Sequence, residues 1–166
     1  MWQKIYIDAV SLAVSAHAGQ TRKFSAEPYI MHPLRVSKTI YILTGDLKLS
    51  AAGVCHDVLE DTVVSYSTLA EATHEDIARL VRTVTKDTSL SKADKEKEFL
   101  GRFKDAQLDT VILKLADRVD NLKDIESQPI HFRERYIKNT EELLGAMPRI
   151  NHKTVNTLID LIMAKI

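Results

Sequence analysis

The chain has 166 residues, with 23 lysines and arginines against 23 aspartates and glutamates, so its formal net charge is zero and its pI is about 7.0. Proteins that hold a nucleic-acid backbone or an anionic membrane by broad electrostatics usually carry a basic excess, so neither partner is expected. Hydrophobic residues make up 45% of the chain, an ordinary globular value, and this length favours a single domain over residues 1–166.

Cysteine content and the N-terminal segment indicate the compartment. Cys55 is the only cysteine, so no internal disulfide and no CxxC thiolate site is expected. Lys4 and Asp8 interrupt the apolar stretch that a signal peptide would need, and no run reaches the ~20 apolar residues of a membrane span. We therefore expect a soluble, cytoplasmic protein in which Cys55 is an inert core residue.

Helical spacing recurs along the chain and strand-like alternation is nowhere sustained, which predicts an all-α fold. In chain order, the first three helices are expected over residues 6–16, 34–43 and 49–62. Two more should follow capping boxes at residues 73–76 and 91–94. The last three are expected over 109–125, between Pro129 and Gly145, and after Pro148. Pro33 would occupy the first turn of the second helix, leaving His32 at the junction between loop and helix, and Gly45 would lie just beyond the end of that helix.

Three carboxylates on the third expected helix point to a cation site. Asp57, Glu60 and Asp61 stand at i, i+3 and i+4 and would share one helical face, where like charges repel by a few tenths of a kcal/mol per pair. His56 precedes Asp57, and imidazole and carboxylate together suit a divalent transition ion. Two ligands alone would bind weakly, so others are needed from elsewhere in the chain.

Two further ligands are available. His32 precedes Pro33, which restricts its backbone. Asp117 lies opposite the apolar stripe of helix 109–125, with Asn121 one turn further on. The set of His32, His56, Asp57 and Asp117 would supply two nitrogens and two oxygens and leave coordination positions open, as in catalytic metal sites.

The four residues follow the H…HD…D order of HD phosphohydrolases, and the surrounding blocks resemble the hydrolase domain of RelA/SpoT homologues, particularly the stand-alone small alarmone hydrolases. These blocks read AHAGQTRK (16–23), PYIMHP (28–33), HDVLEDT (56–62), VTK (84–86) and KLADR (114–118), and the match runs from about residue 10 to residue 125. The resemblance implies a single-domain helical bundle of the HD-domain type.

The resemblance also implies an enzyme, a manganese-dependent 3′-pyrophosphohydrolase that degrades guanosine tetra- and pentaphosphate, (p)ppGpp, to GDP or GTP and pyrophosphate. It implies Mn²⁺ as cofactor, held by His32, His56, Asp57 and Asp117. It implies that Glu60 and Asp61 orient or deprotonate the attacking water, and that the nucleotide is bound by Arg22, Lys23, Ser25 and Asn121.

Other functions remain open. The loop that carries Ser25 is one residue longer than is common in the family, and Asp120 and Asp124 add negative charge on either side of Asn121. The same chemistry could therefore serve (p)ppApp or NADPH, and a silent alarmone sensor is a further alternative. Retention of Glu60 and Asp61 argues against a sensor. The expected partner is a small nucleotide carrying a pyrophosphate, and no oligomeric state follows from the sequence.

Overall fold

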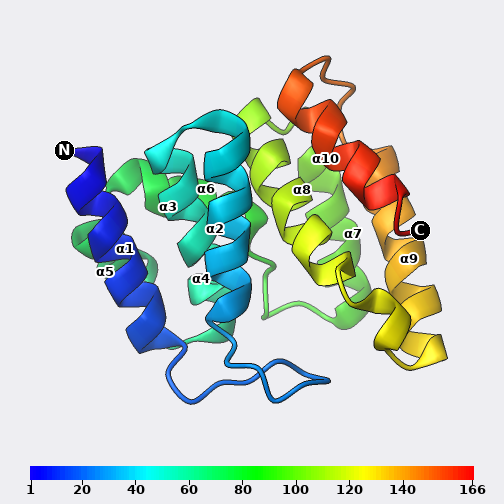
Figure 1. The fold of residues 1–166 in the computed structure, drawn as a ribbon, viewed down its shortest axis with the longest axis horizontal. Coiled ribbons are helices and arrows are strands. Elements are labelled where there is room, and N and C mark those ends of the chain that lie inside the picture. Colours follow the sequence, from blue (N-terminus) through cyan, green and yellow to red (C-terminus); the bar gives the residue numbers. More distant parts are fainter. The chain divides into compact units, whose positions relative to one another are not determined.

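Helices make up every regular element of the computed structural model, which describes residues 1–166 (Figure 1). Thr21 and Pro28 form an isolated β-bridge, and there is no strand. The all-α prediction is confirmed. No helix is both long enough and apolar enough to cross a lipid bilayer. The chain divides into two units, Met1–Thr85 and Lys86–Ile166, which are described separately below.

The first unit is organised around a helix, α3 (Leu47–Cys55), that is buried over most of its length. Its elements are α1 (Trp2–Ala16), α2 (Met31–Thr44), α3 (Leu47–Cys55), α4 (Val58–Asp61), α5 (Tyr66–Ala72) and α6 (Glu75–Val84). Helix α3 packs against α1, α2 and α6 (Figure 1). Every residue from Leu49 to Cys55 is buried, which is the pattern of a helix covered on all sides.

Gly53 allows α2 and α3 to approach closely. A Cβ atom at this position would lie 2.8 Å from Ile40 Cδ1, 3.1 Å from Ser37 Cα and 3.3 Å from the Ser37 backbone nitrogen. The Ile40 methyl group could rotate away, but the backbone of α2 could not move without shifting the whole helix. The α2–α3 spacing therefore depends on the missing side chain of Gly53.

The second unit contains a second set of packed helices. Its elements are α7 (Lys92–Arg102), η1 (Phe103–Asp105), α8 (Leu108–Leu122), η2 (Ile125–Ser127), α9 (Ile130–Ala146) and α10 (Lys153–Met163). Helix α8 packs against α10, and α7 packs against α9. Phe99 and Phe103 are both 1% exposed and meet edge to face, with ring centroids 5.0 Å apart. These two rings bury the apolar side of the highly charged helix α7.

Several expected helix ends are confirmed. Gly45 follows α2 in the left-handed conformation, with φ +68°. The Ser91 hydroxyl accepts a hydrogen bond from the Asp94 backbone nitrogen at 3.2 Å, so Ser91 is the N-cap of α7. Pro129 directly precedes α9, and Pro148 separates α9 from α10. Each of these ends has a local chemical cause that the sequence displays directly.

Other expectations were wrong. The helix expected over residues 49–62 is broken, because α3 ends at Cys55 and α4 begins at Val58. His32 lies inside the first turn of α2 and not at a loop junction, because α2 begins at Met31. The cap of α6 is His74 and not Thr73: His74 Nδ1 accepts from the Asp76 backbone nitrogen at 3.1 Å. Helix α5 was not predicted, because it has only seven residues.

Substituting Gly53→Ala should destabilise the protein by about 1–3 kcal/mol, because the new methyl group overlaps the α2 backbone. The measurement is the free energy of unfolding in urea. Gly145→Ala is the matched control, since Gly145 is also helical and a Cβ there meets nothing within 4 Å. The control should be neutral or up to ~1 kcal/mol more stable than the natural protein, because alanine favours helix. Equal effects of the two substitutions would contradict the close approach at Gly53.

Cys55 should not react with thiol reagents in the native protein. Burial raises the pKa of its thiol to about 12, and the side chain is 0% exposed. Ellman's reagent at pH 8 should therefore label no thiol in native protein and one thiol per chain in denaturant. Glu71→Cys adds a second thiol on the exposed surface of α5 and should react at once, which controls for the reagent. Rapid labelling of native wild-type protein would show that Cys55 is accessible.

Candidate metal centre

Three side chains from neighbouring elements of the first unit converge on one point. His32 comes from the first turn of α2, His56 caps the C-terminal end of α3, and Asp57 precedes α4. One candidate ligand atom from each lies within 4.8 Å of the others. The break between α3 and α4 thus occurs at two of the three converging residues.

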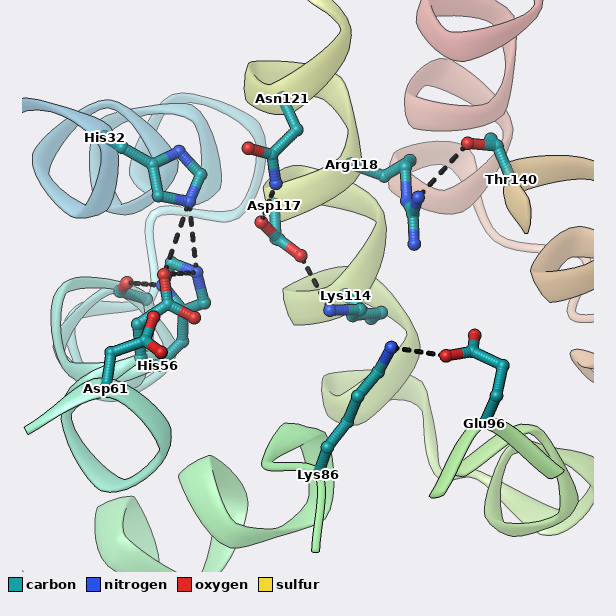
Figure 2. Close-up of polar contacts among 12 residues, drawn as sticks. His32, His56, Asp61, Lys86, Glu96, Lys114, Asp117, Arg118, Asn121 and Thr140 are labelled. Carbon is teal, nitrogen blue, oxygen red and sulfur yellow. Dashed lines mark hydrogen bonds and ion pairs between the residues drawn. The ribbon is translucent and has the colours of Figure 1, made fainter. Parts of the chain in front are cut away.

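The distances describe a tight cluster of electron-pair donors. His32 Nε2 lies 3.3 Å from His56 Nε2 (Figure 2). Asp57 Oδ2 lies 3.0 Å from His56 Nε2 and 3.6 Å from His32 Nε2. The side chains of His32 and His56 are 1% and 2% exposed, whereas that of Asp57 is 20% exposed. The two imidazoles are therefore buried, and the carboxylate remains open to solvent on one side.

A hydrogen bond sets the tautomer of His56. Its Nδ1 lies 2.8 Å from the backbone carbonyl of Gly53, and a carbonyl can only accept, so Nδ1 is the donor. In the neutral ring the lone pair is then on Nε2, which faces His32 and Asp57. A histidine that binds a metal through one ring nitrogen usually donates the N–H of its other ring nitrogen to a carboxylate, a backbone carbonyl or water.

The same hydrogen bond lies at the break in the helix. In a continuous helix the Gly53 carbonyl would be offered to the backbone N–H of Asp57, four residues later. Here the His56 side chain uses that acceptor, and Asp57 has φ −98° and ψ −4°, at the edge of the helical region. The expectation that Asp57, Glu60 and Asp61 extend one helix with His56 is corrected accordingly.

The donor set fits a divalent cation. Two buried imidazole nitrogens and a carboxylate oxygen that face one another need either a shared proton or a cation between them, because their lone pairs would otherwise repel. Nitrogen and carboxylate donors together suit a transition ion. The predicted grouping of His32, His56 and Asp57 is thus present in the geometry of the first unit.

Short helix α4 carries the other two acidic residues. The backbone nitrogens of Glu60 and Asp61 donate to the Asp57 carbonyl at 3.2 and 2.9 Å, so all three residues belong to one turn. Partial burial, and then the negative charge of Asp57, raise the pKa of Asp61 above its ordinary value. Asp57 and Asp61 therefore repel each other across this turn.

The loop between α1 and α2 reaches this turn through two side chains. Tyr29 donates its hydroxyl proton to Asp57 Oδ2 at 2.6 Å and lies 3.2 Å from Asp61 Oδ2. The Gln20 side-chain nitrogen donates to the Asp61 backbone carbonyl at 3.0 Å, and its oxygen accepts from His17 Nδ1 at 2.8 Å. His17 thus supports the loop and is outside the candidate metal-binding cluster of His32, His56 and Asp57.

The remaining predicted residues of this loop differ in position. The Arg22 guanidinium lies 5.9 Å from the centre of the Tyr29 ring, which places Arg22 beside a residue that contacts the acidic turn. Lys23 lies over the exposed ring of Phe24, at 5.5 Å. The hydroxyl of Ser25 accepts from the Glu27 backbone nitrogen at 3.3 Å. Of these three contacts, that of Arg22 involves a residue, Tyr29, that itself bonds to the candidate centre.

Asp117 and Asn121 belong to α8 in the second unit. Lys114 Nζ donates to Asp117 Oδ2 at 2.7 Å, and Asn121 Nδ2 donates to Asp117 Oδ1 at 2.5 Å (Figure 2). Asp117 is 5% exposed and Asp120 is 9% exposed, so the polar edge of α8 is buried, although it was predicted to lie opposite the apolar stripe. Two donors on its own helix therefore fix the orientation of the Asp117 carboxylate.

Two residues that shape the centre were missed by reasoning from the sequence. Gly53 provides both the close approach of α2 and α3 and the carbonyl that orients His56. Tyr29 bonds to Asp57 and Asp61, which are 28 and 32 residues away. Tyr29 stands in the block PYIMHP, three residues before His32, and that spacing is the signal that would have drawn attention to it.

Comparison with known proteins identifies the family of the chain. A sequence profile described as "HD domain" matches residues 9–144, which span both units. A probable guanosine-3′,5′-bis(diphosphate) 3′-pyrophosphohydrolase of Synechocystis is 33% identical over 147 residues, covering 84% of this chain and 19% of the relative. The bifunctional (p)ppGpp synthase/hydrolase SpoT of Escherichia coli K12 is 32% identical over 145 residues, covering 84% and 20%. The chain spans about a fifth of the length of these curated relatives.

Solved structures show the same fold. One, titled "A metazoan ortholog of SpoT hydrolyzes ppGpp and plays a role in starvation responses", has a TM-score of 0.85 at 24% identity and covers 96% of this chain and 94% of its own. A Listeria monocytogenes structure has a TM-score of 0.67 at 20% identity and covers 86% and 98%. The resemblance to RelA/SpoT hydrolase domains is confirmed by the named relatives. With a profile match over most of its length and the paired histidines and aspartate in place, the chain belongs to the HD domain family.

Proposed function

We propose that this chain is a manganese-dependent (p)ppGpp 3′-pyrophosphohydrolase that releases pyrophosphate and leaves GDP or GTP. The observation that carries the proposal is the convergence of His32, His56 and Asp57 within 4.8 Å. Further support comes from the relatives of Synechocystis and Escherichia coli, whose names state that activity. Residues 1–166 would form one domain, since the HD profile continues through the boundary between the two units.

The proposed ligand set consists of His32, His56, Asp57 and Asp117. Asp117 is included because it completes the H…HD…D order of the family and because its buried carboxylate is held by Lys114 and Asn121. When bound, a divalent ion would supply Lewis-acid chemistry, which lowers the pKa of water and offsets the charge of a phosphate. We propose Mn²⁺ for this role on the basis of the family resemblance.

Glu60 and Asp61 would act on the attacking water. Both residues belong to α4, and their backbone nitrogens bond to the Asp57 carbonyl, which supports a role next to the cluster. They would orient this water and take up its proton as it attacks the phosphorus bonded to the ribose 3′ oxygen. That bond breaks, pyrophosphate leaves, and the ribose oxygen takes up a proton.

Arg22, Lys23, Ser25 and Asn121 are the proposed contacts to the nucleotide. Arg22 has the strongest support among them, because it packs on Tyr29 beside the acidic turn. The proposed partner is a small nucleotide and not a nucleic acid or a membrane, in keeping with the zero net charge. A cytoplasmic location stays a prediction from the lone cysteine.

Purified protein with Mn²⁺ should release pyrophosphate from ppGpp, and excess EDTA should abolish the release. The measurement is product quantification by ion-exchange chromatography, with ppApp and NADPH offered in parallel. Faster turnover of either competitor would redirect the proposal to that substrate. Binding of ppGpp without turnover of any of the three would refute an enzyme and indicate a sensor.

Two substitutions should separate metal binding from proton transfer. Asp57→Ala should lower Mn²⁺ affinity by roughly 100-fold or more, because it removes a ligand from a cluster of three. Glu60→Gln should keep the metal affinity and lower turnover by about 10²–10⁴-fold, because the amide cannot accept a proton. Isothermal titration with Mn²⁺ and steady-state kinetics measure the two effects. Loss of metal in both variants would contradict the separate roles.

A further inference from the structure

Tyr29 links the metal cluster to the acidic turn through one proton. Its hydroxyl lies 2.6 Å from Asp57 Oδ2 and 3.2 Å from Asp61 Oδ2. A phenol has a single proton to donate. The main hydrogen bond therefore goes to Asp57, which is nearer, and Asp61 accepts a weaker, bifurcated bond from the same proton. The proton thereby lies between two carboxylates that repel each other.

The oxygen that accepts this bond is the one that faces the histidines. Asp57 Oδ2 is the atom 3.0 Å from His56 Nε2 and 3.6 Å from His32 Nε2. A carboxylate oxygen has two lone pairs, so Oδ2 can accept from Tyr29 on one side and serve as a ligand on the other. Removing the hydroxyl would leave the Asp57 side chain with less constraint on its rotation.

The Tyr29 ring is itself held in place. The His17 ring packs against it at a centroid distance of 4.9 Å, and the His32 ring meets it edge-on at 6.0 Å. The Tyr29 backbone nitrogen donates to the Gln20 carbonyl at 2.9 Å. With both the backbone and the ring held, the direction of the hydroxyl is set before any ligand binds.

We propose that Tyr29 is a positioning residue that aims Asp57 Oδ2 at the histidine pair and, through the shared proton, holds Asp61 at a fixed distance from it. This inference rests on the proposed function, because it assigns to Tyr29 a role in the same metal centre. Tyr29 touches one ligand and one proposed catalytic carboxylate, so it acts on both metal affinity and turnover.

The test compares Tyr29→Phe with Tyr66→Phe. Phenylalanine keeps the ring and its packing and removes only the hydroxyl. Tyr66 is a matched control from the same unit, because its hydroxyl also donates to a carboxylate, Glu75 Oε1, at 2.7 Å. Isothermal titration with Mn²⁺, the visible absorption of the Co²⁺-loaded protein and steady-state kinetics on ppGpp are measured for both variants and the wild type.

Tyr29→Phe should lower Mn²⁺ affinity by about 10–100-fold and change the Co²⁺ spectrum, because the ligand carboxylate loses its outer hydrogen bond. At saturating Mn²⁺ its kcat should fall while KM stays within about twofold, because no substrate contact is removed. Tyr66→Phe should match the wild type in every readout. Wild-type metal affinity and kcat in Tyr29→Phe, or equal losses in Tyr66→Phe, would overturn the inference.

Asp61→Asn provides a test that does not depend on the folding of Tyr29→Phe. With the negative charge at residue 61 gone, Asp57 is the stronger acceptor of the Tyr29 proton, so Mn²⁺ affinity should be kept and the Co²⁺ spectrum should remain close to that of the wild type. A large loss of metal affinity in Asp61→Asn would contradict the assignment of Asp57 as the principal partner. Failure of the wild type itself to bind Mn²⁺ or Co²⁺ would refute the proposed function, which is a separate outcome.

Discussion

The candidate centre depends on how closely α2 and α3 can approach. His32 lies in the first turn of α2 and His56 is the C-cap of α3, so the distance between their ring nitrogens depends on the packing of the two backbones. At Gly53 that packing leaves no room for a methyl group, since Ser37 Cα lies 3.1 Å from the position of a Cβ atom. The same glycine offers the carbonyl that orients His56. One residue without a side chain therefore controls both the spacing and the tautomer of the histidine pair.

Electrostatics then explains why so many polar groups surround this point. Two buried imidazoles and two neighbouring carboxylates would be costly to keep together without proton donors or a cation. Tyr29 supplies a proton to the carboxylates, and the Gln20 side chain ties the same turn to the loop after α1. The loop between α1 and α2 is thus part of the centre and not only a connection between helices.

Much of the fold and part of the centre were predictable from the sequence. Helix ends marked by local chemistry, such as Ser91 and Gly45, were found because a cap depends on residues that are close in the chain. The pairing of His32 with His56 and Asp57 was found because the order and spacing of these residue types are specific. The role of Asp117 stays a prediction, carried by the same order of residues.

The features that were missed depend on contacts between distant residues. Periodicity predicts one helix over residues 49–62, and it cannot show that the helix is interrupted where the His56 side chain bonds to the Gly53 carbonyl. The hydroxyl of Tyr29 meets a partner 28 residues away, and only the folded chain shows which one. These residues lie at the proposed functional site, where local preference and tertiary structure most often disagree.

Cys55 has a consequence for experiments on ligand binding. It is the only cysteine, it is fully buried, and it is the immediate neighbour of His56. Because the sulfur is buried, a reagent should reach it only when α3 opens, so the rate of thiol labelling under native conditions would measure the free energy of that local opening. A ligand that binds only the closed form slows the labelling in proportion to its occupancy. The natural sequence thus contains a reporter of occupancy at the neighbouring centre, and no probe has to be introduced.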